Sequence, residues 1–294
     1  MNVGFIGLGI MGKPMSINVQ KAGHQVYAFD FHMDRAEDLV KLGGVACSCG
    51  KEVAEKSDVI ITMLQNSPNV EAAIFGENGL AEGLSAGKCI IDMSSIAPLA
   101  SRDFAKRLAE MGVDFLDAPV SGGEPKAIDG TIAVMVGGKE EVFAKYEDLL
   151  KTMASTVTLV GEVGAGNITK LANQMIVAIN IAAISEAYSL AKKAGVDPAR
   201  VYEAIRSGLA GSTVMDQKSQ KIFNGDFTPG FRIELHIKDL QNVMDTSHEI
   251  NVSSPFSALA MEIMQSLKAH GLEKDDHSGI AEWYEMVNNM KLQG

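Results

Sequence analysis

Blocks of apolar residues recur along the first half of the chain, and each is followed by a turn and a stretch with helical periodicity. The apolar blocks are short and continuous, which is typical of strands buried on both faces of a parallel sheet. They predict strands at 3–6, 25–29, 58–64, 88–93, 113–118, 132–136 and 156–160, and the periodic stretches predict helices at 13–22, 37–42, 70–75, 100–111 and 141–153. Strands alternating with helices predict an α/β domain with a doubly wound sheet.

The strand pattern stops near Gly164, and the rest of the chain is expected to be all helical. Two helix starts, Asp197-Pro198 and Ser254-Pro255, place an N-cap residue before a proline at the first helical position. Helices are expected at 198–205, 231–250, 256–269 and 278–290. The chain is therefore expected to divide into an α/β domain over 1–162 and a helical domain over 163–294, with 161–166 as the hinge.

The helical half is expected to open with one long helix, from the glycine-rich turn at 161–166 to about residue 191. This stretch contains no proline and is apolar almost all round, as in helices buried in a core or between subunits. Asn180, Ser185 and Glu186 interrupt it, which favours a buried helix over a membrane span. Its first turns place Lys170 and Asn173 three residues apart, on one face.

A glycine-rich turn follows the first strand and opens the first helix, as the dinucleotide-binding fingerprint requires. Gly7 permits the tight turn, Gly9 lets the backbone approach a pyrophosphate, and Gly12 lets the helix pack closely on the strand. The free amides of the helix N-terminus then face the phosphates. The alternative is that the glycines serve only the turn. We expect a Rossmann-type domain whose cofactor contacts include Gly7, Leu8, Gly9, Ile10, Met11 and Gly12.

An aspartate, Asp30, stands at the end of the second strand. A carboxylate there can accept hydrogen bonds from the ribose hydroxyls of the cofactor and would repel a 2′-phosphate. The next residues, Phe31 and His32, supply no arginine for that phosphate. The sequence therefore favours NADH over NADPH, while a protein that accepts both remains compatible with it.

Three polar loops follow later strands, at the strand ends where α/β proteins bind ligands. The first is Gln65-Asn66-Ser67-Pro68. The second contains Ser95, which could contact the ribose or nicotinamide or could cap the following helix. The third comprises Ser121, Gly122 and Gly123, whose exposed amides and hydroxyl could bind a carboxylate. An ordinary glycine loop is the alternative for the third.

The two domains are expected to form a cleft that suits hydride transfer to a carbonyl. Such a reaction needs a proton donor, an anchor for the charged end of the substrate and exclusion of water. Lys170 is the candidate donor, because burial and the helix N-terminus would both lower its pKa. Asn173 could hold a substrate oxygen or orient the lysine. The alternatives are that Lys170 is a solvated surface lysine and that Lys238, which could reach the cofactor, forms a surface pair with Asp239.

Composition narrows the function further. A net charge of −11 with a pI near 5.0 argues against nucleic-acid binding. The cysteines, Cys47, Cys49 and Cys89, are few and odd in number, and the histidines lack metal-ligand spacing, so neither a disulfide framework nor a metal site is expected. The N-terminus carries no basic segment before an apolar one, so no signal peptide is expected. We therefore expect a cytoplasmic protein.

Four motifs, in order along the chain, resemble the 3-hydroxyisobutyrate dehydrogenase, or β-hydroxyacid dehydrogenase, family. They are FIGLGIMGKPMSIN at 5–18, DAPVSGGEPKAIDGT at 117–131, GAGNITKLAN at 164–173 and KDL at 238–240. The resemblance implies a Rossmann domain followed by a helical domain, and NAD(P)-dependent oxidation or reduction of a 3-hydroxy acid by dimers or tetramers. Four ordered motifs over nearly the whole chain are far more specific than one glycine turn.

The resemblance also implies roles for individual residues. Lys170 would be the catalytic acid/base, and Ser121, Gly122, Gly123 and Asn173 would bind a small carboxylate substrate. Ser95, Lys238 and the Met63-Leu64-Gln65 loop would contact the cofactor, although family members usually have proline where this chain has Gln65. A different class, a dinucleotide-binding or sensor protein without catalysis, would need the lysine or the substrate loop to be lost, and both are present.

Overall fold

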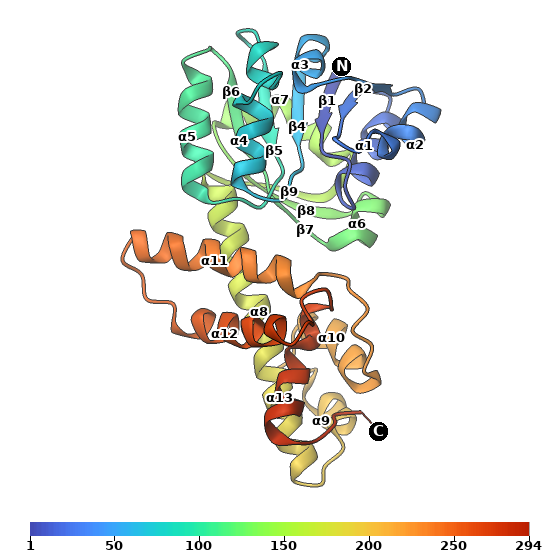
Figure 1. Cartoon of the computed structure of the whole chain (residues 1–294), viewed down its shortest axis with the longest axis vertical. Coiled ribbons are helices and arrows are strands. Elements are labelled where there is room, and N and C mark those ends of the chain that lie inside the picture. Colours follow the sequence, from blue (N-terminus) through green and yellow to red (C-terminus); the bar gives the residue numbers. More distant parts are fainter. Residues whose placement is uncertain (294) are drawn as a thin grey trace. The chain divides into compact units, whose positions relative to one another are not determined.

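The structure is a computed structural model that describes residues 1–293 (Figure 1). The chain folds into two compact units, Met1–Lys170 and Leu171–Gly294. The division falls inside the long helix α8 (Ala165–Lys193). We propose domains that comprise residues 1–162 and 163–294.

The first unit is built on one sheet, with strand order β3-β2-β1-β4-β5-β6-β8-β7 and β9 paired with β8. All pairs from β3 to β6 are parallel, while β8 runs antiparallel to β6 and β7 and parallel to β9. The strands are β1 (Asn2–Ile6), β2 (Gln25–Phe29), β3 (Val45–Ala46), β4 (Val59–Thr62), β5 (Cys89–Asp92), β6 (Asp114–Asp117), β7 (Val120–Ser121), β8 (Ile132–Gly137) and β9 (Ala154–Gly161). The order reverses at β1, so the crevice beyond the ends of β1 and β4 is where such sheets bind ligands.

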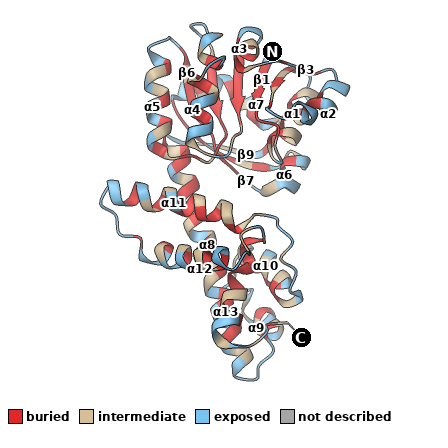
Figure 2. Ribbon diagram, in the orientation of Figure 1, coloured by how far each residue is buried: buried red, intermediate tan, exposed pale blue. Residues whose placement is uncertain are grey.

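Helices cover both faces of this sheet, which confirms the doubly wound fold. On one face α1, α2, α6 and α7 contribute to a core that includes Val19, Leu39 and Leu150. On the other face α3, α4 and α5 contribute to a core that includes Val53, Ile74 and Phe104. The central strands are buried (Figure 2). The helices are α1 (Gly12–Lys21), α2 (Glu37–Lys41), α3 (Gly50–Lys56), α4 (Ser67–Phe75), α5 (Pro98–Ala109), α6 (Gly123–Asp129) and α7 (Glu140–Lys151).

Two short helices of this unit were not predicted, because each buries too little to leave a periodic signal. In α3 the buried residues are Gly50, Val53 and Ala54, and in α6 only Ala127 is buried. The expected polar loop at 65–68 is shorter than predicted, since Ser67 and Pro68 already belong to α4. Asn66 is the N-cap there, accepting a hydrogen bond from the amide of Asn69.

The second unit is all helical, as expected, and is built along α8. Leu171, Ala178 and Ile181 of α8 share a core with α11 and α12, while Ile184 and Tyr188 share another with α9 and α10. In Figure 1 the α11 and α12 ribbons cross α8. Its other helices are α9 (Pro198–Ile205), α10 (Thr213–Asn224), α11 (Ile233–Glu249), α12 (Pro255–Ala269) and α13 (Ile280–Asn288).

Helix α10 is the element of this unit that the sequence pattern did not predict. Its buried residues, Met215, Ser219 and Ile222, have the spacing of one helix face. Ser212 is the N-cap, and its hydroxyl accepts a hydrogen bond from the amide of Met215. A serine in the middle of the buried stripe hid that pattern. Helix α8 is long and apolar enough to cross a membrane by length and composition alone, a test that the core helix of a soluble protein also passes.

Candidate functional site

The glycine turn between β1 and α1 has the geometry that a bound pyrophosphate needs. Gly7 has φ +94°, and its amide donates to the carbonyl of Phe29 at 3.0 Å. A Cβ on Gly7 would collide with the carbonyl oxygen of Met63, and one on Gly12 would collide with that of Gly7. A Cβ on Gly9 would meet nothing within 4 Å. Gly9 therefore leaves the turn open to a ligand, while Gly7 and Gly12 close it against the sheet.

Asp30 is 9% exposed and is held by backbone amides on both oxygens. The amide of Leu8 donates to Oδ2 at 2.7 Å, and that of His32 donates to Oδ1 at 2.8 Å. The first bond ties the carboxylate at the end of β2 to the glycine turn. Asp30 is thus part of the frame of the turn as well as a candidate partner for the ribose.

The structure places an arginine beside Asp30 that the two following residues, Phe31 and His32, do not supply. Arg35 Nη1 lies 3.4 Å from Asp30 Oδ1 and 3.5 Å from Oδ2. The 3-10 helix Met33–Ala36 brings Arg35 back beside the carboxylate, which inspection of the two adjacent residues could not reveal. A guanidinium at this place offsets the charge that would repel a 2′-phosphate.

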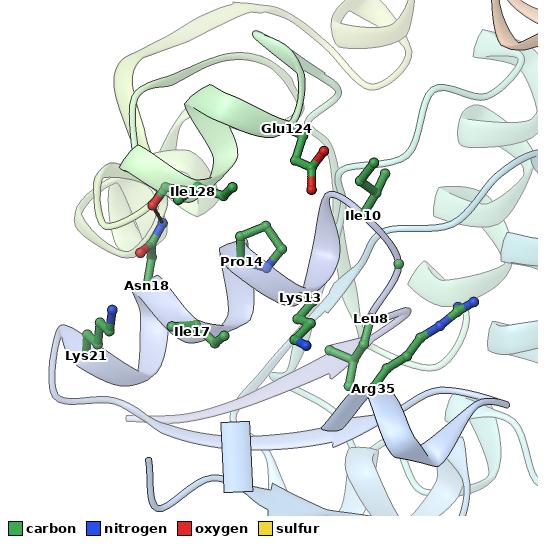
Figure 3. A pocket seen from close by; sticks show the side chains of 11 residues that line it. Leu8, Ile10, Lys13, Pro14, Ile17, Asn18, Lys21, Arg35, Glu124 and Ile128 are labelled. Atoms are coloured by element: carbon green, nitrogen blue, oxygen red, sulfur yellow. Dashed lines mark hydrogen bonds between the residues drawn. The ribbon is translucent and has the colours of Figure 1, made fainter. Parts of the chain in front are cut away.

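Two cavities meet at this arginine. One, of about 500 Å³, is lined by Gly7, Asp30, Arg35, Leu64 and Gln65 among others. The other, of about 540 Å³, lies along α1 and is also lined by Arg35. Figure 3 shows Lys13 and Pro14 of α1 and Glu124 of α6 around it. Together the cavities provide room beside the glycine turn for an elongated ligand with anionic groups.

Polar groups at the ends of β4 and β5 brace the next part of the crevice. Thr62 donates to Asp92 Oδ1 at 2.8 Å, and Ser94 accepts from the amide of Leu64 at 2.8 Å. Ser95, half-buried, follows this pair. The N-cap of α5 is Ala97, whose amide donates to the Ser67 hydroxyl, so the capping alternative for Ser95 is wrong.

The start of α8 is anchored by a carboxylate from the sheet. Asp117, at the end of β6, accepts from the amides of Gly164 and Asn167, each at 2.7 Å. Burial raises the pKa of Asp117 to about 7, against the opposing effect of these two amides. Helix α8 begins at Ala165, so Asp117 accepts hydrogen bonds from the amides of the residue just before the helix and of Asn167 in its first turn.

Asn167 fixes the same turn from its other side. Its Oδ1 accepts from the amide of Ile96 at 3.1 Å, and its Nδ2 donates to the Ser101 hydroxyl at 3.1 Å. Lys170 follows one turn later and is 7% exposed. A solvated surface lysine is therefore the wrong interpretation of Lys170. The turn that carries it is tied to β6, to the loop after β5 and to α5.

The Ser121-Gly122-Gly123 segment forms the junction of β7 and α6. Gly122 and Gly123 have φ of +145° and +70°, which a residue with a side chain rarely adopts. Ser121 is half-buried and Gly122 is exposed. The turn therefore offers successive backbone amides next to a hydroxyl, and its role as a carboxylate anchor stays a prediction.

In the second unit Asn173 belongs to a line of polar groups that the sequence predicted only in part. Its Nδ2 donates to Gln174 Oε1 at 2.8 Å, and Gln174 Nε2 donates to Asp239 Oδ2 at 2.7 Å. Lys238 Nζ lies 3.0 Å from Asp239 Oδ1. Gln174 and Asp239 are 4% and 2% exposed, so Lys238 and Asp239 are not a surface pair. Nothing in the local sequence shows that the polar side chain of Gln174 is buried.

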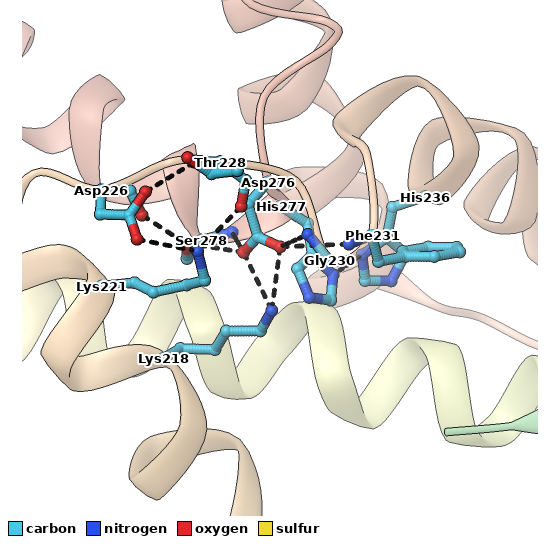
Figure 4. Close-up of polar contacts among 10 residues, drawn as sticks. All are labelled: Lys218, Lys221, Asp226, Thr228, Gly230, Phe231, His236, Asp276, His277 and Ser278. Atoms are coloured by element: carbon cyan, nitrogen blue, oxygen red, sulfur yellow. Dashed lines mark hydrogen bonds and ion pairs between the residues drawn. The ribbon is translucent and has the colours of Figure 1, made fainter. Parts of the chain in front are cut away.

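A second buried polar cluster joins α11 to the segment before α13 (Figure 4). His236 Nδ1 lies 2.9 Å from His277 Nδ1, and His236 Nε2 lies 3.1 Å from the carbonyl oxygen of Gln174. Asp276 accepts from Lys218 and from the amides of Gly230 and Phe231. Although burial opposes it, the positive charges of His277 and Lys218 hold the pKa of Asp276 below its usual range. The cluster fixes α11 against α8. Within residues 1–293, no group of acidic, histidine or cysteine side chains could hold a metal ion.

Comparisons with known proteins match both units. Residues 2–161 match a family model described as the NAD binding domain of 6-phosphogluconate dehydrogenase. Residues 164–284 match one described as NAD-binding of NADP-dependent 3-hydroxyisobutyrate dehydrogenase. These matches identify the cofactor as a nicotinamide dinucleotide, NAD(P), and the open Gly9 and the paired Asp30 and Arg35 are chemically suited to it.

The relatives cover the chain from end to end. The chain is 42% identical to the 2-hydroxy-3-oxopropionate reductase of Escherichia coli over 99% of its own length and 100% of that protein. It is 38% identical to the 2-(hydroxymethyl)glutarate dehydrogenase of Eubacterium barkeri, over 100% and 98%. Among solved structures it resembles the Mycobacterium tuberculosis 3-hydroxyisobutyrate dehydrogenase with L-serine, with a TM-score of 0.90, 30% identity and coverage of 96% and 98%. The chain therefore belongs to the 3-hydroxyisobutyrate dehydrogenase family of NAD(P)-dependent oxidoreductases.

Proposed function

We propose that this protein reduces tartronate semialdehyde (2-hydroxy-3-oxopropanoate) to D-glycerate with NADH or NADPH. The observation that carries the proposal is the 42% identity to a 2-hydroxy-3-oxopropionate reductase over the whole chain. Three segments that resemble such reductases support it: SGGEPKAIDGT at 121–131, LAGSTV at 209–214 and FRIELHIKDL at 231–240. The first of them contains Ser121, Gly122 and Gly123, three of the four candidate substrate residues, whereas the glycine turn concerns only the cofactor.

Lys170 is the proposed general acid. When bound, the nicotinamide supplies a hydride to the aldehyde carbon, and the developing alkoxide needs a proton. Lys170 would donate it from Nζ, and in the oxidative direction it would take the proton back. The anchoring of its helical turn by Asp117 and Asn167 supports this role, because a proton donor must be held in position.

The remaining roles concern the substrate and the cofactor. We propose that Ser121, Gly122 and Gly123 bind the carboxylate through amides and a hydroxyl, and that Asn173 binds a second polar group of the substrate. Gly7 to Gly12, Asp30, Met63, Leu64, Gln65, Ser95 and Lys238 would hold the dinucleotide. The apolar surface of α8, where Ile176 is 61% and Leu190 is 74% exposed, supports a homodimer or homotetramer. We propose a soluble, cytoplasmic enzyme.

Another specificity within the family is the second candidate. The likeness to a 3-hydroxyisobutyrate dehydrogenase, at a TM-score of 0.90, favours 3-hydroxyisobutyrate among these, with glyoxylate and succinic semialdehyde as further candidates. A dinucleotide-binding protein without catalysis is a remote third.

A substrate panel separates these functions. The purified protein would be assayed with tartronate semialdehyde, methylmalonate semialdehyde, glyoxylate and succinic semialdehyde, each with NADH and NADPH. We expect the highest kcat/KM for tartronate semialdehyde. A higher kcat/KM for another aldehyde would replace the proposed substrate. Quenching of NADH fluorescence without turnover of any aldehyde would favour the protein without catalysis.

A further inference from the structure

We propose that Gln174 and Asp239 act as positioning residues that turn the side-chain oxygen of Asn173 toward the substrate, where it accepts a hydrogen bond from a substrate hydroxyl. The inference rests on the proposed role of Asn173 in substrate binding. It specifies that Asn173 acts as a hydrogen-bond acceptor toward the substrate, and so predicts which substrates the site selects.

The direction follows from a chain of donors and acceptors. A carboxylate can only accept hydrogen bonds, whereas a primary amide has a donor end and an acceptor end. Gln174 must therefore direct Nε2 at Asp239, which it does at 2.7 Å. Its Oε1 is then the end that faces Asn173, and Asn173 must direct Nδ2 at it, at 2.8 Å. The orientation of both amides thus depends on Asp239.

Burial makes this orientation costly to reverse. Gln174 is 4% exposed and Asp239 is 2% exposed, so turning either amide would bring two acceptors together without water to relieve them. The other oxygen of Asp239, Oδ1, lies 3.0 Å from Lys238 Nζ. Asn173 itself is half-buried. Because its Nδ2 faces Gln174, its Oδ1 points to the opposite side of the amide.

An acceptor at this position distinguishes substrates by a single group. The aldehyde oxygen and the carboxylate of the substrate accept hydrogen bonds and gain nothing from another acceptor. A hydroxyl donates one, and tartronate semialdehyde carries a hydroxyl on the carbon between its two other groups. Methylmalonate semialdehyde has a methyl group there and would leave Oδ1 unpaired. A site built to bond a hydroxyl rejects an analogue that lacks it.

The test compares two stable alcohols in the oxidative direction, D-glycerate and 3-hydroxyisobutyrate, which differ by hydroxyl against methyl at that carbon. The measured quantity is the ratio of their kcat/KM values, which does not depend on the fraction of active enzyme. We expect the wild type to favour glycerate by a factor on the order of ten or more, the scale of one neutral hydrogen bond.

The Asp239→Asn variant should lose this preference. The new amide at position 239 can donate to Gln174, so the two neighbouring amides are free to turn and to present Nδ2 of Asn173 to the substrate instead. The double variant that combines Gln174→Glu with Asp239→Asn should recover the preference. Its new carboxylate at position 174 can only accept, from Asn173 on one side and from the new amide on the other. The double variant also keeps the net charge of the group. The ion pair between Lys238 and position 239 is lost in both variants, so their difference isolates the orientation.

Asp245→Asn is the matched control. Asp245 lies on α11, as Asp239 does, and accepts a hydrogen bond from Gln241 Nε2 at 2.7 Å. The two residues form an amide-carboxylate pair like that of Gln174 and Asp239, but an exposed one. We expect its ratio to stay within about twofold of the wild type, since exposed hydrogen bonds contribute little. A ratio that stays unchanged in Asp239→Asn, which includes an equal loss of kcat/KM for both alcohols, would overturn the inference. A double variant that fails to recover the wild-type ratio would also overturn it. An equal loss would mean that Asn173 acts through Lys170.

Side-chain amide exchange measured by NMR tests the orientation without turnover. The Nδ2 protons of Asn173 should exchange more slowly in the wild type and the double variant than in Asp239→Asn. Equal exchange rates in all three would contradict the inference. If neither alcohol is oxidised but the exchange rates follow this order, the proposed function fails and the orientation holds.

Discussion

The cofactor side of this protein and its candidate substrate side are built in different ways. The glycine turn is made of consecutive residues whose backbone shape is fixed by Gly7 and Gly12. The start of α8 depends instead on side chains from distant parts of the sequence, such as Asp117. A site made by the backbone is sensitive to the addition of single carbon atoms. A site made by distant side chains is sensitive to the loss of single hydrogen bonds.

Two substitutions in the glycine turn should show this sensitivity most strongly. Gly12→Ala places a methyl group against the carbonyl of Gly7, so we expect a lower Tm and NADH affinity reduced on the order of 100-fold. Gly9→Ala meets no protein atom within 4 Å, so its Tm should match the wild type while NADH binding is still lost. Thermal unfolding and quenching of NADH fluorescence measure both quantities.

The contrast between the two glycines carries this prediction. Tight NADH binding by Gly9→Ala would show that the dinucleotide does not approach the turn closely. A normal Tm in Gly12→Ala would show that α1 can move away from the turn at little cost.

At the start of α8 the sensitive group is Asp117, and it should make stability depend on pH. Its pKa of about 7 lies above the value of roughly 4 for an aspartate in an unfolded chain. The folded state therefore binds the proton more tightly, and the free energy of unfolding should fall as pH rises from about 4 to 7. The slope from this group is at most about 1.4 kcal/mol per pH unit.

Urea unfolding at several pH values between 5 and 8 measures this slope. Asp117→Asn should remove it, whereas Asp114→Asn, at a half-buried aspartate of the same strand paired with Lys139, should keep it. Equal slopes in the wild type and Asp117→Asn would mean that Asp117 does not titrate in this range.

The smallest expected effect concerns cofactor choice. Arg35→Ala should weaken NADPH binding by about tenfold and NADH binding by less than about twofold, since only NADPH carries the 2′-phosphate. Lys21→Ala, in the cavity along α1, serves as the control. Isothermal titration with both cofactors gives the dissociation constants. Equal losses for NADH and NADPH would place Arg35 away from the 2′-position.

How much of the structure the sequence predicts depends on whether a feature is formed by consecutive residues or by side chains from separate segments. Seven strands of the sheet, the long helix and the glycine turn could be predicted, because continuous apolar runs and glycines at fixed spacing leave a local signal. The two-residue strands β3 and β7 and the antiparallel direction of β8 leave none. Arg35 beside Asp30, the anchoring of α8 by Asp117 and the burial of Gln174 could not, because each needs contacts between residues apart in sequence. Short helices such as α3 and α6 were missed because few of their residues are buried.

The central claim is that Lys170 performs the proton transfer of a nicotinamide-dependent reductase. The most direct test is the Lys170→Ala variant, assayed for turnover of tartronate semialdehyde and for NADH binding in the same preparation. We predict that kcat falls by a factor on the order of 1,000 or more, because general acid catalysis contributes about 10²–10⁴-fold, while the NADH dissociation constant stays within about threefold of the wild type. Near-normal turnover by this variant would contradict the account.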